Sequence, residues 1–401
     1  MKNEHFVVID DSQAILVMMK SMLAELGYNN VVTSTHPLKA LDNIQRHPNK
    51  YRAVFTDLNM PEIDGMEVIR RLGQMGYKGG VCIVSELEDR IMELASEIAR
   101  QHKVCLIGNI AKPISPSHIQ RAIKKLIQIE ERTFSNYDKM SKEELAGCIE
   151  AGYVTPYYQP KIDIISKHVP SVEVLARICK PGEANAILPG SFINTATEHH
   201  MLDMITDQIV DKALTDLPVL QKELGTHLNL GINLSPTQLV NPNFPSKLLE
   251  TISQRQIDPA KIILEITEEY ALKSTTQLEC LNRFRIKGFG LSLDDFGTGF
   301  TNLHQLRTLP FTEVKIDRNL VSNIHDDRFN QVVVQSLHDI CENLPVKLIA
   351  EGIEEFEDLD YLESHYQEII AQGFLICKPR PLDSLLHWYH SWSKGIEAKQ
   401  A

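Results

Sequence analysis

From about residue 150 onward, short apolar runs repeatedly end at a polar or charged residue. The eight runs are Tyr157–Ile162, Val172–Ala176, Leu228–Leu234, Ile262–Ile266, Phe289–Leu293, Glu313–Ile316, Lys347–Ala350 and Ile369–Ile376. Apolar runs of this length are typical of buried strands, and most of the segments between them are long enough for a crossover helix. Strands that alternate with helices in this way predict a (β/α)8 barrel, the TIM-barrel fold.

The polar residues at or near the ends of these runs are mostly carboxylates and amides. They are Gln159, Glu173, Asn233, Glu265, Asp294, Asp295, Lys315, Glu351 and Gln372. In a barrel of parallel strands such residues gather at the carboxyl ends, where this fold places its chemistry. An all-oxygen ligand set suits Mg²⁺ or Mn²⁺, not zinc, and Lys315 adds a cation. The strand ends therefore predict a metal-dependent site.

The pair Asp294-Asp295 ends one apolar run and is followed by a loop with Gly297 and Gly299. Two adjacent acids at a strand end are costly to bring together unless a cation neutralises them. An Asp-rich turn is the simpler interpretation of this pair on its own. The other polar strand ends favour the cation.

Residues 1–127 show a second alternation of strands and helices. The apolar runs are Phe6–Ile9, Ala53–Phe55, Val81–Val84 and Val104–Ile107. This order predicts an open parallel sheet with ligands beyond the carboxyl ends of its strands. Asp10, Asp11, Asp57, Ser85 and Lys112 all fall at those ends.

These five residues are suited to phosphoryl chemistry. Asp10 and Asp11 can hold Mg²⁺, and Asp57 can attack a phosphoryl group as a carboxylate nucleophile. Ser85 can donate a hydrogen bond to the acyl phosphate, and Lys112 can pair with it. A lone Asp at a strand end is usually a turn or a helix cap, so the signal lies in all five residues occurring in this order.

Composition narrows the function classes. The chain has 401 residues, enough for two domains. Its 53 acidic and 41 basic residues, a formal charge of −12, argue against a nucleic-acid-binding surface. The seven scattered cysteines form no Cys-x-x-Cys pair and predict a reduced, cytoplasmic protein. The start of the chain does not have the pattern of a signal peptide, and the apolar runs are too short for membrane insertion.

Residues 1–127 resemble the receiver domain of two-component response regulators. The matching residues are Asp10-Asp11, Asp57, Met60-Pro61, Gly65, Ser85 and Lys112-Pro113. The resemblance implies a flavodoxin-like fold, one Mg²⁺ at Asp10, Asp11 and Asp57, and phosphorylation of Asp57 by a sensor histidine kinase. It also implies a switch through Ser85 and Lys112 and a cis bond before Pro113. Receivers usually carry an aromatic residue where this chain has Asn109, so the aromatic half of the usual switch is missing.

Residues 141–401, after a linker at 128–140, resemble the EAL domain family of cyclic di-GMP phosphodiesterases. The matching segments are Tyr158-Gln-Pro-Lys161, Glu173-Val-Leu-Ala-Arg177, Asn233-Leu-Ser-Pro236, Glu265-Ile-Thr-Glu268, Asp294-Asp-Phe-Gly-Thr-Gly299, Lys315-Ile-Asp317, Glu351-Gly-Ile-Glu354 and Gln372-Gly373. Val174 stands where the motif has Ala, a change for which we expect a small packing effect. The resemblance implies a modified (β/α)8 barrel with one antiparallel strand. Residues 382–394 predict a closing helix with a short tail.

The resemblance also implies a two-metal hydrolysis of cyclic di-GMP to linear pGpG, with two Mg²⁺ or Mn²⁺ ions. One ion would be held by Glu173, Asn233, Glu265 and Asp294, and the other by Asp294, Asp295 and Glu351. Glu173, Asp295, Lys315 and Glu351 are the expected catalytic residues, with Asp295 or Lys315 orienting or deprotonating the water. Arg177 would grip a phosphate, while Gln159 and Gln372 would hold substrate or water. Glu268 would anchor the loop 296–302, and Glu268→Ala would cost roughly 10–100-fold in metal affinity or turnover.

Two other functions compete with hydrolysis. A degenerate EAL domain could act as a cyclic di-GMP sensor, or the chain could be a scaffold whose barrel mediates assembly. Degenerate members usually lose metal ligands or the loop after the double Asp, whereas this chain keeps them all, which favours catalysis. The layout resembles RocR-type two-domain response regulators and implies a cognate kinase and a homo-oligomer, either a dimer or a tetramer.

Overall fold

The structure is a computed structural model that describes residues 2–86, 89–102, 104–134, 139–183, 185–267, 274–297 and 303–400. The chain divides into two compact units, Met1–Asn136 and Tyr137–Ala401. Each unit has hydrophobic clusters built from its own residues. None of the helices in the described part is both long and apolar enough to cross a membrane.

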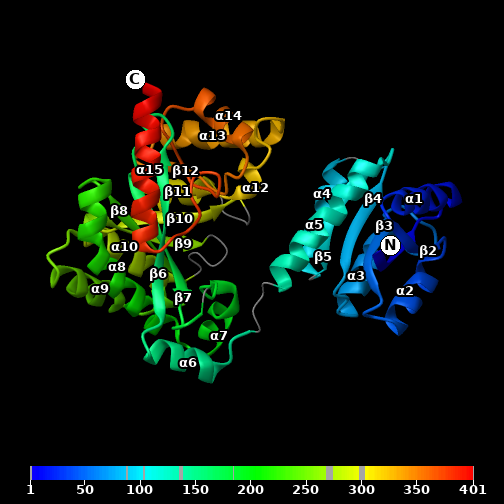
Figure 1. The fold of residues 1–401 in the computed structure, drawn as a ribbon, viewed down its shortest axis with the longest axis horizontal. Helices are drawn as coiled ribbons and strands as arrows, with labels where there is room; N and C mark the ends of the chain where they lie inside the picture. Colours follow the sequence, from blue (N-terminus) through cyan, green and yellow to red (C-terminus); the bar gives the residue numbers. More distant parts are fainter. Residues whose placement is uncertain are drawn as a thin grey trace. The chain divides into compact units, whose positions relative to one another are not determined.

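The first unit is a five-stranded parallel sheet in the order β2-β1-β3-β4-β5 (Figure 1). Its elements are β1 Lys2–Ile9, α1 Gln13–Glu25, β2 Tyr28–Ser34, α2 Pro37–Arg46, β3 Tyr51–Asp57, α3 Gly65–Gln74, β4 Gly80–Ser85, α4 Asp89–Gln101, β5 Cys105–Ala111 and α5 Pro116–Phe134. This arrangement confirms the flavodoxin-like prediction. The Lys112-Pro113 bond is cis, as expected.

Both faces of this sheet are covered by helices, which is why its central strands are apolar throughout. One core joins the sheet to α1 and α5 through residues such as Met19 and Ile123. The other joins the opposite face to α2, α3 and α4 through residues such as Leu41 and Ile69. The sequence analysis missed β2 because this edge strand is polar at most positions and pairs with β1 alone.

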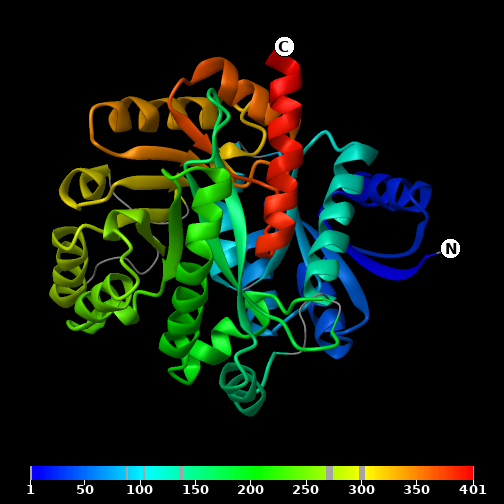
Figure 2. The ribbon, with the colours of Figure 1, turned by 60° about the vertical axis from the view of Figure 1, so that its left-hand side comes forward.

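In the second unit, eight strands of the described chain close into a barrel in the order β10-β11-β12-β13-β6-β7-β8-β9 (Figures 1 and 2). The strands are β6 Val154–Asp163, β7 Ser171–Ile178, β8 Asn229–Leu234, β9 Ile262–Thr267, β10 Gly290–Phe296, β11 Glu313–Ile316, β12 Lys347–Ala350 and β13 Ile369–Ala371. The α-helices are α6 Lys142–Glu150, α7 Ile193–Glu198, α8 Leu202–Leu224, α9 Phe244–Ser253, α10 Thr275–Ile286, α11 Leu303–Thr308, α12 Arg318–Val321, α13 Arg328–Glu342, α14 Phe356–His365 and α15 Leu382–Gln400. Short 3-10 turns lie at Pro189–Ser191, Gln238–Val240 and Pro259–Lys261. The modified TIM-barrel prediction is therefore confirmed.

The modification is the direction of β6. It pairs antiparallel with both β7 and β13, whereas the other neighbouring strands of the barrel pair in parallel. The β6–β7 ladder is long, and the outer half of β7 continues past its pairing with β8. Glu173 therefore lies within β7, at the rim of the barrel, while Arg177 lies on the extension beyond it.

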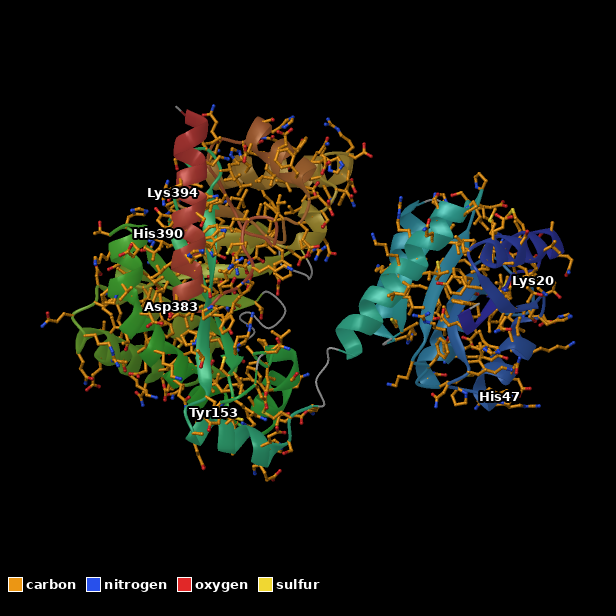
Figure 3. All side chains as sticks on the ribbon, in the orientation of Figure 1. Lys20, His47, Tyr153, Asp383, His390 and Lys394 are labelled. Carbon is orange, nitrogen blue, oxygen red and sulfur yellow. The ribbon has the colours of Figure 1, made fainter. Side chains whose placement is uncertain are left out.

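The closing helix is longer than the sequence suggested. We expected a helix at 382–394 with a short tail, but α15 continues to Gln400. It packs against α8 and β6, as the turned view of Figure 2 also shows. His390, labelled on α15 in Figure 3, forms an ion pair with Glu223 of α8, with its Nε2 3.2 Å from Oε2.

Packing around α10 leads to a stability prediction. Phe284 is fully buried, and its ring meets those of Phe244 and Phe289 edge to face at centroid distances of 5.6 and 5.3 Å. We expect Phe284→Ala to lower the free energy of unfolding of the barrel by about 3–5 kcal/mol, because it leaves a cavity. Urea unfolding followed by tryptophan fluorescence measures this, since both tryptophans lie in α15.

Ile286→Ala on the same helix is the matched control. Its side chain is 77% exposed, so the change should stay within about 0.5 kcal/mol. Equal losses for the two variants would contradict the assignment of Phe284 to the core.

Candidate active site

The carboxyl ends of the barrel strands bring the polar residues of the sequence together. Glu265, Asp294 and Lys315 lie within β9, β10 and β11, while Glu351 and Gln372 directly follow β12 and β13. The ladder places Asn233 of β8 level with Glu265. These residues are far apart in the sequence and meet because neighbouring strands end at the same face of the barrel.

The ammonium group of Lys315 lies at the centre of this cluster. Its Nζ is 2.6 Å from Glu265 Oε2, 2.7 Å from Glu351 Oε1, 3.0 Å from Asp294 Oδ1 and 3.5 Å from Glu173 Oε2. The Lys315 side chain is only 1% exposed. One buried cation thus compensates four converging carboxylates.

A layer of amides holds Glu173 in place. Asn233 Nδ2 donates to Glu173 Oε1 at 2.8 Å, and Gln372 Nε2 donates to Oε2 at 2.7 Å. Gln372 Nε2 also lies 3.1 Å from Gln159 Oε1, and Gln159 donates in turn to the backbone carbonyl of Cys377 at 3.0 Å. Asn233 is exposed, whereas Gln159 and Gln372 are buried. The amides therefore fix the Glu173 carboxylate from two sides.

The carboxylates differ in their affinity for protons. Burial opposes ionisation of Glu173, but Lys315, Lys161 and the amide donors outweigh it and lower the pKa to about 2. Burial raises the pKa of Glu351 to about 8, aided by Asp294 and Glu173 and only partly offset by Lys315. Like charges this close cannot all ionise in the absence of more cations. Glu351 therefore binds a proton more readily than Glu173.

Asp294, Asp295 and Glu351 form a group suited to a divalent cation. Each offers a carboxylate oxygen, and these oxygens lie within 4.8 Å of one another. Burial, together with the adjacent Asp294, raises the pKa of Asp295 to about 6. Asp295 has a positive φ of 57°, which is uncommon outside glycine. Mg²⁺ and Mn²⁺ prefer oxygen ligands. Closely spaced carboxylates such as these are therefore suited to binding either ion.

Two family models match the chain. The EAL domain model matches residues 142–379, and the response regulator receiver domain model matches residues 6–124. The chain belongs to the EAL domain family. The barrel is thus an EAL domain, and it follows a receiver domain in the sequence.

Relatives and solved structures agree with this assignment. The chain is 26% identical over 337 residues to cyclic di-GMP phosphodiesterase RocR of Pseudomonas aeruginosa, covering 83% of this chain and 85% of RocR. It is 29% identical over 250 residues to the probable cyclic di-GMP phosphodiesterase PdeG of Escherichia coli, covering 61% of this chain but 48% of PdeG. The structure of PaMucR phosphodiesterase in complex with c-di-GMP superposes with a TM-score of 0.56 at 27% identity, over 61% of this chain and 98% of that one.

Arg177 of the EAL domain lies apart from the carboxylate cluster. Its guanidinium stands over the Tyr157 ring, 5.5 Å from the centroid, and donates to the Ala176 carbonyl at 2.8 Å. Its position on the β7 extension suits a group at the rim of the site. Glu268 and residues 298–302 of the adjoining loop lie outside the described residues, so the anchoring role of Glu268 stays a prediction.

Lys161, the last residue of the Tyr158-Gln-Pro-Lys161 motif, has a role that was not predicted from the sequence. The Lys161 side chain is fully buried, and its Nζ is 2.6 Å from Glu265 Oε1. A single lysine in an apolar strand carries no signal that it points toward an acid on another strand. Only its position opposite β9 inside the closed barrel shows this contact.

A cavity of about 570 Å³ borders the cluster. Glu173 and Asn233 line one part of it, and apolar residues of α7 and α8, such as Ile193 and Ile205, line another. Gln238 also lines this cavity, and its Nε2 donates to Asp203 Oδ1 at 2.8 Å. The cavity therefore has an acidic part at Glu173 and an apolar chamber at α7 and α8, with polar side chains at its edge.

The receiver unit builds its site around a partly buried lysine, Lys112. Lys112 Nζ is 2.9 Å from both Asp10 Oδ2 and Asp57 Oδ2. Oxygens of Asp10, Asp11 and Asp57 lie within 4.8 Å of one another, which suits a divalent cation. Ser85 is buried at the end of β4, and its carbonyl accepts from the backbone N–H of Lys112 at 2.9 Å. The structure thus brings all five predicted receiver residues to one edge of the sheet.

Asn109, which replaces the usual aromatic residue, contacts α4. Its Nδ2 donates to Ser96 Oγ at 2.6 Å and approaches the Met92 carbonyl at 3.4 Å. Ser96 Oγ itself donates to the Met92 carbonyl at 2.7 Å. The strand β5 is therefore tied to α4 by a polar contact.

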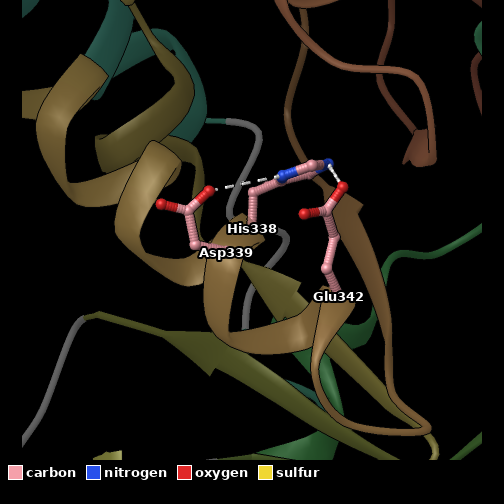
Figure 4. Close-up of side chains that lie close together, drawn as sticks. All are labelled: His338, Asp339 and Glu342. Atoms are coloured by element: carbon pink, nitrogen blue, oxygen red, sulfur yellow. Dashed lines mark ion pairs between the residues drawn. The ribbon is translucent and has the colours of Figure 1, made fainter.

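One further group of titratable side chains lies on α13 (Figure 4). His338 Nδ1 is 3.9 Å from Asp339 Oδ1, and its Nε2 is 3.8 Å from Glu342 Oε1. One ring nitrogen of His338 and one oxygen from each acid lie within 4.8 Å of one another, a spacing that a metal ion could span. This group also precedes β12, at the opposite end from the carboxyl ends of the strands. It is not part of the candidate site.

The raised pKa of Glu351 predicts that metal binding depends on pH. Below pH about 8 the metal-free protein carries a proton on Glu351 that an incoming cation must displace. Mn²⁺ affinity should therefore rise with pH, by up to about tenfold per unit for one displaced proton, and level off above about 8. Calorimetry in buffers of different ionisation enthalpy should detect the released proton.

The titration is best performed on a chain with Asp11→Asn, which weakens the cation site of the receiver. In that chain Glu351→Gln should bind Mn²⁺ weakly and with little dependence on pH. A wild-type affinity that stays constant between pH 6 and 8 would rule out a protonated Glu351.

Proposed function

We propose that the EAL domain of this chain is a cyclic di-GMP phosphodiesterase that releases linear pGpG. The observation that carries the proposal is the convergence of four carboxylates on the buried Lys315, with Asp294, Asp295 and Glu351 in metal-binding geometry. The similarity to RocR along most of both chains supports the same substrate class. The intact ligand set argues against a sensor that only binds the nucleotide.

Two Mg²⁺ or Mn²⁺ ions fit the donors of this site. Glu173, Asn233, Glu265 and Asp294 would hold one, and Asp294, Asp295 and Glu351 the other. When bound, such ions neutralise phosphate charge and lower the pKa of water. The carboxylate shared by both sets, Asp294, explains why two adjacent acids end this strand.

The charges of the cluster favour one assignment for proton transfer. The neighbouring acids raise the pKa of Lys315 well above its usual range, even though burial opposes this. Lys315 therefore keeps its proton and serves as a positive charge beside the carboxylates and the substrate phosphate. Asp295 is the remaining candidate, because burial and the adjacent Asp294 raise the pKa of its carboxyl in the metal-free site. We assign the deprotonation of the attacking water to Asp295.

The remaining residues would bind the dinucleotide. The apolar chamber beside Glu173 has room for a base, with Gln238 and Thr206 at its walls to make polar contacts. Arg177, on the rim, is placed to meet a phosphate. Gln159 and Gln372 act by fixing Glu173 and by holding water at the site.

Phosphorylation of Asp57 by a sensor histidine kinase would control turnover. Asp57 Oδ1 accepts from the backbone N–H of Leu58 at 2.6 Å and Oδ2 faces Lys112, so the carboxylate is held beside a cation. A phosphoryl group there adds negative charge that Lys112 and Mg²⁺ can neutralise. Asn109 on β5 is hydrogen-bonded to Ser96 on α4. A structural change caused by phosphorylation would therefore reach α4 through this polar contact.

The hydrolysis proposal predicts a defined product. Purified protein with Mg²⁺ or Mn²⁺ should convert cyclic di-GMP to pGpG, seen as a new chromatographic peak. Ca²⁺ should inhibit because its coordination shell is larger and looser. Glu173→Ala should lose more than the roughly 10–100-fold typical of groups that support a metal ligand.

Glu198→Ala, which removes an exposed carboxylate paired with Lys139, is the matched control and should keep wild-type turnover. Tight binding of cyclic di-GMP by the wild type without any turnover would replace the enzyme proposal with the sensor.

The control proposal predicts a response to phosphoryl mimics. Beryllofluoride or a small phosphodonor should change turnover by about fivefold or more, the lower end of typical coupling between sites. Asp57→Asn should keep basal turnover and lose the response, measured by initial rates with and without the mimic. The same response in both proteins would mean that the receiver does not act through Asp57.

A further inference from the structure

Glu265 is held between two lysines from opposite sides of the barrel interior. Lys161 Nζ is 2.6 Å from Oε1, and Lys315 Nζ is 2.6 Å from Oε2. All three side chains are at most 1% exposed. Each oxygen of this carboxylate therefore has its own cation.

The two lysines are not equivalent. Lys315 is shared among four carboxylates within 3.5 Å, and an ammonium has three N–H groups to donate. Lys161 has Glu265 as its near partner, since its next acid, Glu313, is 3.9 Å away. Lys161 is therefore the cation dedicated to Glu265.

The direction of β6 explains how Lys161 reaches this position. Gln159 is level with Glu173, and Lys161 is level with Ser171, because β6 runs antiparallel to β7. Lys161 thus starts one layer below the catalytic rim. From there its long side chain extends to Oε1 of Glu265.

A glycine on the neighbouring strand makes room for the contact. A Cβ at Gly231 would lie 2.0 Å from Glu265 Oε1 and 3.4 Å from Lys161 Nζ. Gly231 has ordinary backbone geometry, since it is absent from the positive-φ positions of the described chain. Its requirement for glycine comes from the space occupied by the ion pair.

The layer around Lys161 is polar. Ser171 is its register partner on β7, while Ser292 and Glu313 are paired across β10 and β11. Ser171 Oγ, Ser292 Oγ and Glu313 Oε2 are buried and have no hydrogen-bond partner among the described residues. The positive charge of Lys161 therefore lies among polar groups and not in an apolar core.

We propose that Lys161 is the positioning residue for the metal ligand Glu265. By binding Oε1, it fixes the plane of the carboxylate and leaves Oε2 to the side on which Lys315 lies. It also compensates the charge of a fully buried acid, whose ionisation burial alone would oppose. The inference rests on the proposed function only in taking Glu265 as a ligand of the metal site.

The test measures Mn²⁺ binding by electron paramagnetic resonance on the full chain, with Asp11→Asn in every protein to weaken the receiver site. Lys161→Met keeps the length of the side chain and removes the charge. It should weaken Mn²⁺ binding to the barrel by about 10–100-fold, the range for groups that support a metal ligand. Turnover at saturating Mn²⁺ should recover to within a few-fold of the wild type.

Gly231→Ala provides an independent variant that keeps Lys161. Its Cβ displaces Glu265 Oε1, so Mn²⁺ binding should weaken similarly, and the double variant should lose less than the product of the two effects. If Lys161→Met does not fold, Lys161→Gln, which is uncharged but keeps a hydrogen-bond donor, takes its place. Lys247→Met, which removes an exposed lysine paired with Asp207, should bind Mn²⁺ as the wild type does.

The outcomes separate this inference from the proposed activity. Wild-type Mn²⁺ affinity in Lys161→Met or Gly231→Ala would overturn the positioning role. So would a fall in unfolding midpoint with unchanged Mn²⁺ affinity per folded molecule, because that marks a purely structural residue. A wild type that binds Mn²⁺ but does not hydrolyse cyclic di-GMP would overturn the activity and leave the role of Lys161 standing.

Discussion

The ammonium group of Lys315 is the interaction on which the catalytic end of the barrel depends. Four acids from four different strands point toward one another there, and repulsion would separate or protonate them without a buried positive charge. The lysine compensates them only partly, which leaves Glu351 with a proton and Asp295 with a raised pKa. A site with this remaining negative potential is prepared for divalent cations.

The receiver also compensates closely spaced carboxylates with one lysine, but with fewer acids. Lys112 lies between Asp10 and Asp57, as Lys315 lies among the barrel acids. Burial raises the pKa of Asp10 despite the contact with Lys112. In both units, parallel strands bring acids to one edge, a lysine from another strand or loop holds them, and the set as a whole suits a phosphate-linked chemistry with a divalent cation.

The antiparallel strand β6 places the charge of Lys161 inside the barrel, next to Glu265. In a regular parallel barrel, the residue after a rim position along the chain lies higher, toward the open face. In β6 the order is reversed, so Gln159 reaches the rim and Lys161 lies below it. The floor of the site is therefore built by a strand that runs against the others, and Gly231 leaves the space that the Lys161–Glu265 pair fills.

The sequence alone determined the strand ends and the chemistry they carry. Apolar runs that stop at Glu265, Asp294 and Lys315 predict both the barrel and the oxygen-rich site, because a strand pattern and its terminal residue are local features. The height of a side chain inside the barrel and the direction in which it points are not encoded by the local sequence. The contact of Lys161 with Glu265, the different protonation of Glu173 and Glu351, and the polar edge strand β2 depend on register, closure and burial, which only the tertiary structure sets.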